Sequence, residues 1–158
     1  MADEGMAFFR GRMYEAALER FDGALALQPE NDVALRGSAG ALLALGRAED
    51  AAERFSRYLE LEPRDPDGHV GLAGALAKLG RKGEAIGALR AAVEAGLEDV
   101  RALDAEAFES LRQDIRFVQI AALLAQRAGV RPTDDRGRLI VGGQPVRTLE
   151  LPSREAGE

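Results

Sequence analysis

The sequence predicts an all-α solenoid of stacked helix pairs, and three observations support this prediction. The first is an internal repeat with a period of 34 residues, in which five residues recur in similar form: Ala17 and Ala51, Phe21 and Phe55, Leu25 and Leu59, Leu27 and Leu61, and Pro29 and Pro63. The second is that apolar residues within each unit recur at helical spacing. The third is that a glycine or a proline follows each apolar-periodic stretch. A fixed period of this length is the sequence signature of a helical solenoid.

Capping and turn residues place the individual helices. Gly11 is expected to end the first helix as a C-terminal cap, and Asp32 to cap the third through its carboxylate. Asp65 and Pro66 form a start signal, because the acid caps the helix and proline needs no N–H partner at the first helical position. The helices are expected at 2–10, 14–27, 33–45, 48–61, 66–79 and 82–95.

The period breaks after residue 97. A short helix is expected over 104–111 and a longer one over 114–128. Residues 139–149 are expected to form a hairpin around Gly142 and Gly143, with Pro145 restricting its second strand to an edge. The chain is therefore divided into a helical part, 1–129, and a linker and tail, 130–158, whose end at 153–158 is expected to be disordered.

The repeat resembles the tetratricopeptide repeat, in three units at about 1–31, 32–65 and 66–97. The resemblance implies a right-handed α–α superhelix. The two helices beyond residue 97 look like the closing helices of many bacterial members of the family, and we expect them to cover the apolar face of the last unit. Arg12 departs from the family pattern, which usually has glycine there, and Leu97 stands where its proline would fall.

Composition argues against several classes of function. The net charge of −6 makes non-specific nucleic-acid binding unfavourable. The chain has no cysteine and one histidine, His69, which the resemblance places in the packing between helices. We therefore expect no catalytic site, no metal and no cofactor. The acidic start has no apolar run behind it, so we expect no signal peptide or membrane span and a cytoplasmic location.

The resemblance implies a concave groove, lined by the first helix of each unit, that binds a peptide or helix of a partner protein. The candidate binding residues are Met6, Phe9, Arg10, Val33, Arg36, Gly37, Gly40, Leu43, Val70, Gly71, Gly74 and Lys78. Five further positions correspond to the groove and are not counted among these candidates: Ala2, Asp3, Ala44, Asp67 and Ala77. Their apolar character favours an apolar ligand, and the cations among them are expected to pair with its acidic residues.

One known use of this groove is not expected here. Family members that assist heat-shock chaperones hold a C-terminal carboxylate with lysine, asparagine and arginine side chains. The corresponding positions here hold Ala2, Met6, Gly37, Asp67 and Gly71. None can make the required bonds, and Asp67 would repel a carboxylate, so we expect no binding of such peptides.

Four glycines within the predicted helices have two interpretations. Gly37 and Gly40 recur one period later as Gly71 and Gly74, although a glycine inside a helix costs about 1 kcal/mol relative to alanine. The missing side chains would let a ligand backbone approach the groove. Alternatively, the glycines allow close packing between helices, or are chance substitutions in a chain rich in glycine and alanine.

The sequence therefore predicts a non-enzymatic adaptor or scaffold that binds an apolar helix or extended segment. One alternative is a cytosolic chaperone of secreted proteins, because the length, acidity and repeat number are similar to those of class II type III secretion chaperones. Another is a self-assembling subunit in which the tail of one chain occupies the groove of the next.

Overall fold

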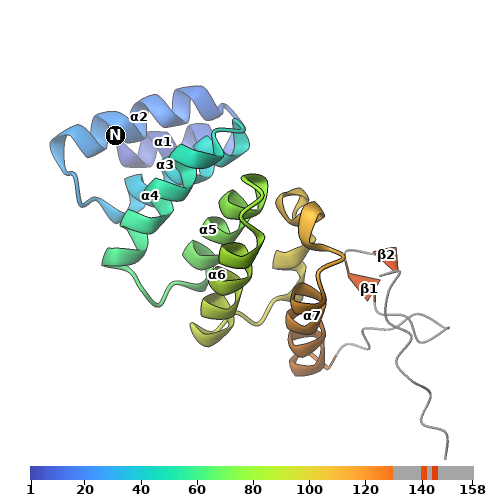
Figure 1. The fold of residues 1–158 in the computed structure, drawn as a ribbon. Coiled ribbons are helices and arrows are strands. Elements are labelled where there is room, and N and C mark those ends of the chain that lie inside the picture. Colours follow the sequence, from blue (N-terminus) through green and yellow to red (C-terminus); the bar gives the residue numbers. More distant parts are fainter. Residues whose placement is uncertain (130–139, 142–143, 146–158) are drawn as a thin grey trace, which may run out of the picture. The chain divides into compact units, whose positions relative to one another are not determined.

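The computed structural model describes residues 1–129 together with 140–141 and 144–145. The chain divides into two compact units, Met1–Leu97 and Glu98–Glu158. The first unit contains six helices, each packed against the next along the chain. Their bounds are α1 Ala2–Arg10, α2 Tyr14–Leu27, α3 Asp32–Ala44, α4 Ala48–Leu61, α5 Pro66–Lys78 and α6 Lys82–Glu94 (Figure 1). These bounds agree with the expected helices to within a residue.

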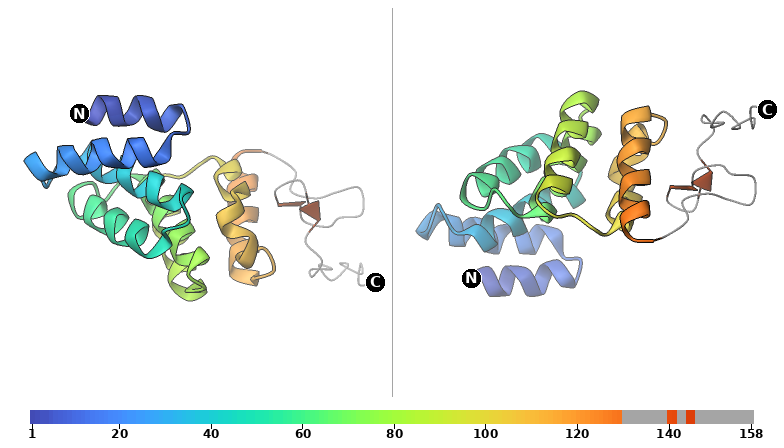
Figure 2. Two further views of the ribbon diagram at one scale, coloured as in Figure 1. Left: turned by 90° about the horizontal axis from the view of Figure 1, so that it is seen from above. Right: turned by 90° about the horizontal axis from the view of Figure 1, so that it is seen from below.

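The first helices of successive pairs also contact one another. α1 contacts α3, and α3 contacts α5, although each of these pairs is separated by a complete helix in the sequence. The helices therefore stack in chain order, as the further views show (Figure 2). This arrangement confirms the predicted all-α solenoid.

Side-chain caps begin α3 and α5. Asn31, and not Asp32, is the N-cap of α3, because its Oδ1 atom accepts a hydrogen bond from the backbone N–H of Ala34 at 2.9 Å. The expectation for Asp32 was wrong by one residue, and its carboxylate instead lies within the first turn. Asp65 caps α5 as expected, accepting from the N–H of Asp67 at 3.1 Å with Pro66 at the first helical position.

The turn inside each helix pair uses one left-handed residue. Gly46 and Gly80 have φ angles of 77° and 75°, and Arg12 takes the same conformation with φ 59°. In each turn the N–H of the following residue donates at 2.9 Å to the carbonyl five positions earlier. Gly11 is the C-cap of α1, as predicted, and its φ of −75° leaves Arg12 as the left-handed residue of this turn. The Cβ atom of Arg12 makes this left-handed conformation less favourable than it would be for glycine.

Small residues form the seam inside each helix pair. Ala17, Ala51 and Ala85, which the repeat relates to one another, are fully buried as predicted. Phe21 is also fully buried, and it belongs to a cluster with Ala17 and Ala34. Alanine at the seam lets the two helices of a pair approach closely. The ring of Phe21 fills the space between this pair and the next one.

The second unit has its own small core. The expected helix over 104–111 is instead two 3₁₀ segments, η1 Val100–Asp104 and η2 Glu106–Leu111, separated at Ala105, which is extended with ψ 141°. They are followed by α7, Ile115–Arg127, within the expected range of 114–128, and Asp114 is its N-cap. The rings of Phe108 and Phe117 pack with their centroids 5.8 Å apart. That this unit covers the last helix pair stays a prediction.

A short β-pairing follows in the tail. β1, Ile140–Val141, pairs antiparallel with β2, Gln144–Pro145, and Val141 lies opposite Gln144. This register agrees with the predicted hairpin. The proposed Gly142–Gly143 turn and the end of the tail lie outside the described residues.

Candidate functional site

The predicted groove residues lie on α1, α3 and α5, which we call the groove layer. Their exposure differs, and it separates residues available to a ligand from residues that hold the helices together. The exposed members are Arg10, Val33, Arg36 and Lys78. The partly buried members are Met6, Phe9, Gly40, Leu43, Val70 and Gly71, and the buried members are Gly37 and Gly74.

Phe9 connects three helices at one end of the groove layer. Its ring packs edge-on against Tyr14 of α2, with the ring centroids 5.4 Å apart and an interplanar angle of 67°. A Cβ atom added at Gly40 of α3 would lie 3.2 Å from the same ring. Phe9 and Gly40 therefore contribute to helix packing, which limits the part of either residue that a ligand can reach.

Gly37 and Gly71 face aromatic rings of the preceding helix pair. A Cβ atom at Gly37 would overlap the ring of Phe21, lying 2.6 Å from Cε1. A Cβ atom at Gly71 would overlap the ring of Phe55 in the same way, lying 2.9 Å from Cε2. The interpretation in which these two glycines open the groove to a ligand backbone is therefore wrong. They admit an aromatic ring between successive pairs.

Arg36 takes part in a contact that joins α3, α4 and α5. Its Nη1 atom lies 3.9 Å from Oδ2 of Asp65, and the Tyr58 hydroxyl donates to the same oxygen at 2.6 Å. Burial of Tyr58, together with this hydrogen bond, raises the pKa of its phenol well above the usual range. Arg36 therefore has an acidic partner within the chain, so its guanidinium group is not fully available to an acidic residue of a ligand.

The repeat alignment contains a signal for this contact at the position of Tyr58. Tyr58 stands at a repeat position that holds Ala24 and Ala92 in the neighbouring units. Gly68 of α5 provides the space for it, because a Cβ atom there would lie 2.7 Å from Tyr58 Cε1. A large residue at an alanine position, with a glycine in the next helix, indicates a paired substitution.

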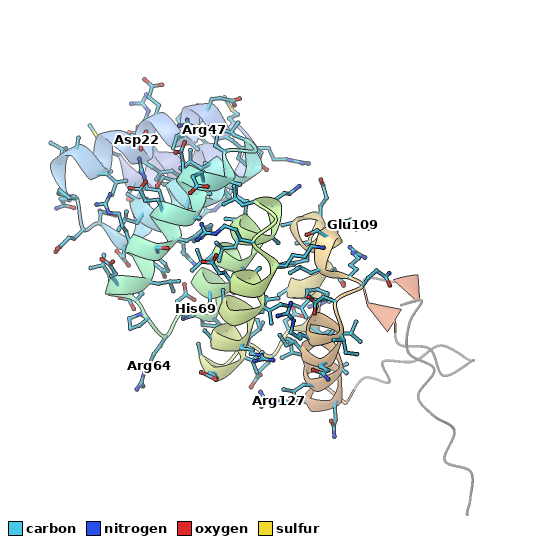
Figure 3. All side chains as sticks on the ribbon, viewed as in Figure 1. Asp22, Arg47, Arg64, His69, Glu109 and Arg127 are labelled. Atoms are coloured by element: carbon cyan, nitrogen blue, oxygen red, sulfur yellow. The ribbon has the colours of Figure 1, made fainter. Side chains whose placement is uncertain are left out.

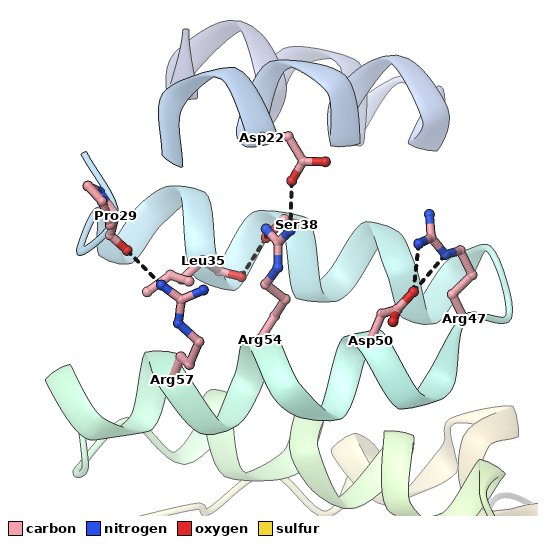
Figure 4. Close-up of polar contacts among 8 residues, drawn as sticks. All are labelled: Asp22, Pro29, Leu35, Ser38, Arg47, Asp50, Arg54 and Arg57. Carbon is pink, nitrogen blue, oxygen red and sulfur yellow. Dashed lines mark hydrogen bonds and ion pairs between the residues drawn. The ribbon is translucent and has the colours of Figure 1, made fainter. Parts of the chain in front are cut away.

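A second polar network joins α2, α3 and α4, and the sequence did not predict it. Arg54 of α4 donates through Nη1 to Ser38 Oγ at 3.1 Å and lies 2.9 Å from Asp22 Oδ1 of α2 (Figure 4). Ser38 is fully buried, and its hydroxyl donates to the Leu35 carbonyl at 3.0 Å. The network joins α2, α3 and α4, and its four residues have no common sequence motif.

The positions of His69 and of the acidic side chains bear on metal binding. His69, shown on α5 in Figure 3, is partly exposed, and its Nε2 atom lies 2.8 Å from the Pro63 carbonyl oxygen, so it is not packed between helices as expected. Residues 1–129 and the two short strands contain no group of three acidic or histidine side chains that could hold a metal ion. In the same part of the chain, no helix is long and apolar enough to cross a membrane.

Comparison with known families agrees with the geometry. Two family models described as tetratricopeptide repeat match the chain, one over residues 11–69 and the other over residues 41–99. Together they extend from the end of α1 to just beyond α6. No curated protein matches the chain. The repeat, the stacked helix pairs and the two matches together show that the chain belongs to the tetratricopeptide-repeat family, whose members are generally protein–protein interaction modules.

Proposed function

We propose that the protein is a non-enzymatic adaptor that binds an apolar helix or extended segment of a partner on the groove layer. The observation that carries this proposal is the exposure of Val33, 40% accessible on α3, in a layer that also has Met6, Leu43 and Val70 partly accessible. Apolar side chains that the fold itself leaves accessible are available to a partner.

The accessible apolar groups are sufficient for a moderate affinity. Complete burial of one aliphatic side chain is worth about 1.5–3 kcal/mol. Association costs and side-chain ordering offset much of this gain, so we expect micromolar binding, near −8 kcal/mol. Arg10, exposed at the C-terminal end of α1, is placed to interact with an acidic residue of the ligand.

Capture of partners by variants of the full chain tests the surface. Val33→Gln should retain the fold and lose the specific partners, because it places an amide where the ligand is apolar. Leu27→Gln is a matched control, since Leu27 is 74% exposed on α2, outside the groove layer. Equal capture of the same partners by both variants and the unaltered chain, with unchanged helicity, would show that the groove layer is not the binding surface.

The same capture experiment distinguishes two alternative functions from that of an adaptor. A cytoplasmic chaperone of secreted proteins would capture export substrates and maintain their solubility on coexpression. A self-assembling subunit would instead capture its own chain, and deletion of residues 130–158 would abolish the assembly. An adaptor should retain its partners after that deletion.

A further inference from the structure

A cleft between α2 and α4 lies outside the groove layer. It consists of two hollows of about 580 and 230 Å³, which adjoin one another because Leu18, Asp22 and Arg47 line both. Leu45 lines the larger hollow and Leu42 the smaller. We call this feature the α2–α4 cleft. It combines aliphatic side chains with charged walls, which is the composition of a site for an amphipathic side chain.

Four of the eight charged side chains along the cleft form ion pairs with one another. The arginines are Arg47, Arg54 and Arg57, and the acids are Glu15, Glu19, Asp22, Asp50 and Glu53. Arg47 pairs with Asp50 at 2.6 Å, and Arg54 pairs with Asp22 at 2.9 Å (Figure 4). Arg57 donates to the Pro29 carbonyl at 3.3 Å. The pairing thus consumes two carboxylates and two guanidinium groups.

Three carboxylates remain without a compensating partner. Within the described part of the chain, Glu15, Glu19 and Glu53 form no hydrogen bond or ion pair. Glu15 and Glu19 are one helical turn apart on α2, so they share a face and border the same leucines. Three such carboxylates outweigh the one guanidinium group, Arg57, whose partner is a neutral carbonyl, so the uncompensated charge of the cleft is negative and disfavours anionic ligands and nucleic acid.

The corresponding surface between α4 and α6 has a different composition. One period after Leu18 stands Ala52, and one period after Asp22 stands Ser56. Glu15, in contrast, is matched by Glu49. The second junction thus retains an acid at Glu49 but lacks the leucine and the aspartate, so Glu49 is a control position for Glu15 outside the cleft.

We propose that the α2–α4 cleft binds a basic segment of a partner protein. The aliphatic stem of a lysine or arginine would lie over Leu18 and Leu45, and its cationic head would reach Glu15 and Glu19. The charge complementarity selects this occupant, because an apolar segment would leave the carboxylates unpaired and an acidic one would be repelled. Basic and apolar ligands could then occupy different helices of the same solenoid.

A short peptide tests the proposal without knowledge of the partner. The probe is a capped tetrapeptide of alternating leucine and arginine, titrated into the full chain while leucine methyl signals are followed by NMR. The Leu18 and Leu45 signals should shift, and the affinity should fall at least threefold from 20 to 200 mM salt because exposed charges are screened. The same peptide with glutamine in place of arginine should bind at least threefold more weakly.

Matched double variants locate the charges responsible. Glu15→Gln with Glu19→Gln should weaken binding of the basic peptide at least threefold. Glu49→Gln with Glu60→Gln removes the same net charge from positions that line neither hollow, and it should leave the affinity unchanged. Equal weakening in both doubles would overturn the proposal, as would methyl shifts confined to other leucines or an absence of binding.

This test is independent of the groove layer. Val33→Gln should leave binding of the basic peptide unchanged, because Val33 is on α3 and lines neither hollow. Loss of peptide binding in that variant would place the basic ligand on the groove layer and overturn the cleft assignment. Loss of partner capture alone would leave the cleft assignment intact.

Discussion

Replacement of Gly37 by alanine tests the packing of α3 against Phe21. The added methyl group would lie 2.6 Å from Phe21 Cε1, whereas ordinary contacts of a Cβ atom begin near 3.4 Å. The ring is fully buried, and Gly5 of α1 lies against it as well, since a Cβ atom there would also lie 2.6 Å from Cε1. The ring is therefore confined by the backbones of two helices.

Two opposing effects determine the free energy of unfolding. Alanine improves helix propensity by about 1 kcal/mol relative to glycine. Overpacking of a dense core costs about 1–3 kcal/mol, and confinement of Phe21 on two sides favours the upper part of that range. We therefore expect Gly37→Ala to lose a net 1–2 kcal/mol, roughly, with a fall in melting temperature of several degrees.

A matched substitution isolates the propensity term. Gly87 lies within α6 with nothing within 4 Å of its Cβ position, so Gly87→Ala should gain up to about 1 kcal/mol. A second control combines Gly37→Ala with Phe21→Leu, which supplies space at the same contact. The double variant should be more stable than the sum of the two single effects predicts, because the methyl group then replaces ring volume.

Urea unfolding followed by circular dichroism measures all four variants. The midpoint should fall for Gly37→Ala and rise for Gly87→Ala, with similar slopes. A gain in stability for Gly37→Ala equal to that of Gly87→Ala would refute the packing argument. It would restore the interpretation in which this glycine opens the groove.

The remaining predictions concern a turn, a phenol and the helix seam. Arg12→Gly should stabilise the chain by about 1 kcal/mol, and Gly46→Ala should destabilise it by a similar amount, because both residues have a left-handed backbone conformation. Melting temperatures that do not shift in opposite directions in the two variants would contradict this. The phenol of Tyr58 should stay protonated in the folded chain above pH 10, near which an ordinary tyrosine titrates, as an absorbance titration would show. The free energy of unfolding should fall as the pH rises above 10, because only the unfolded chain then loses this proton. A single normal transition for both tyrosines in the folded chain would contradict that assignment. Ala51→Leu should cost about 1–3 kcal/mol by overpacking the seam, and an unchanged melting temperature would refute the repeat register.

The sequence by itself determined the repeat, the helices and the seam. The 34-residue period placed the helix pairs, and the residues that end each helix placed α1 to α6 to within a residue, because capping and turn residues act within one or two helical turns. The burial of Ala17, Ala51 and Ala85 followed from the same period. The left-handed conformation of Arg12 was not predicted from its own residue type, although its alignment with Gly46 pointed to this position.

Only the tertiary structure decided which neighbour each side chain meets. Gly37 and Phe21 belong to different helix pairs, and the period alone does not say whether the missing Cβ atom would point at a ring or at a ligand. The contact of Asp65 with Tyr58 and Arg36 likewise joins three helices. Such contacts depend on the rotation and separation of whole helices, which many weak packing interactions determine together.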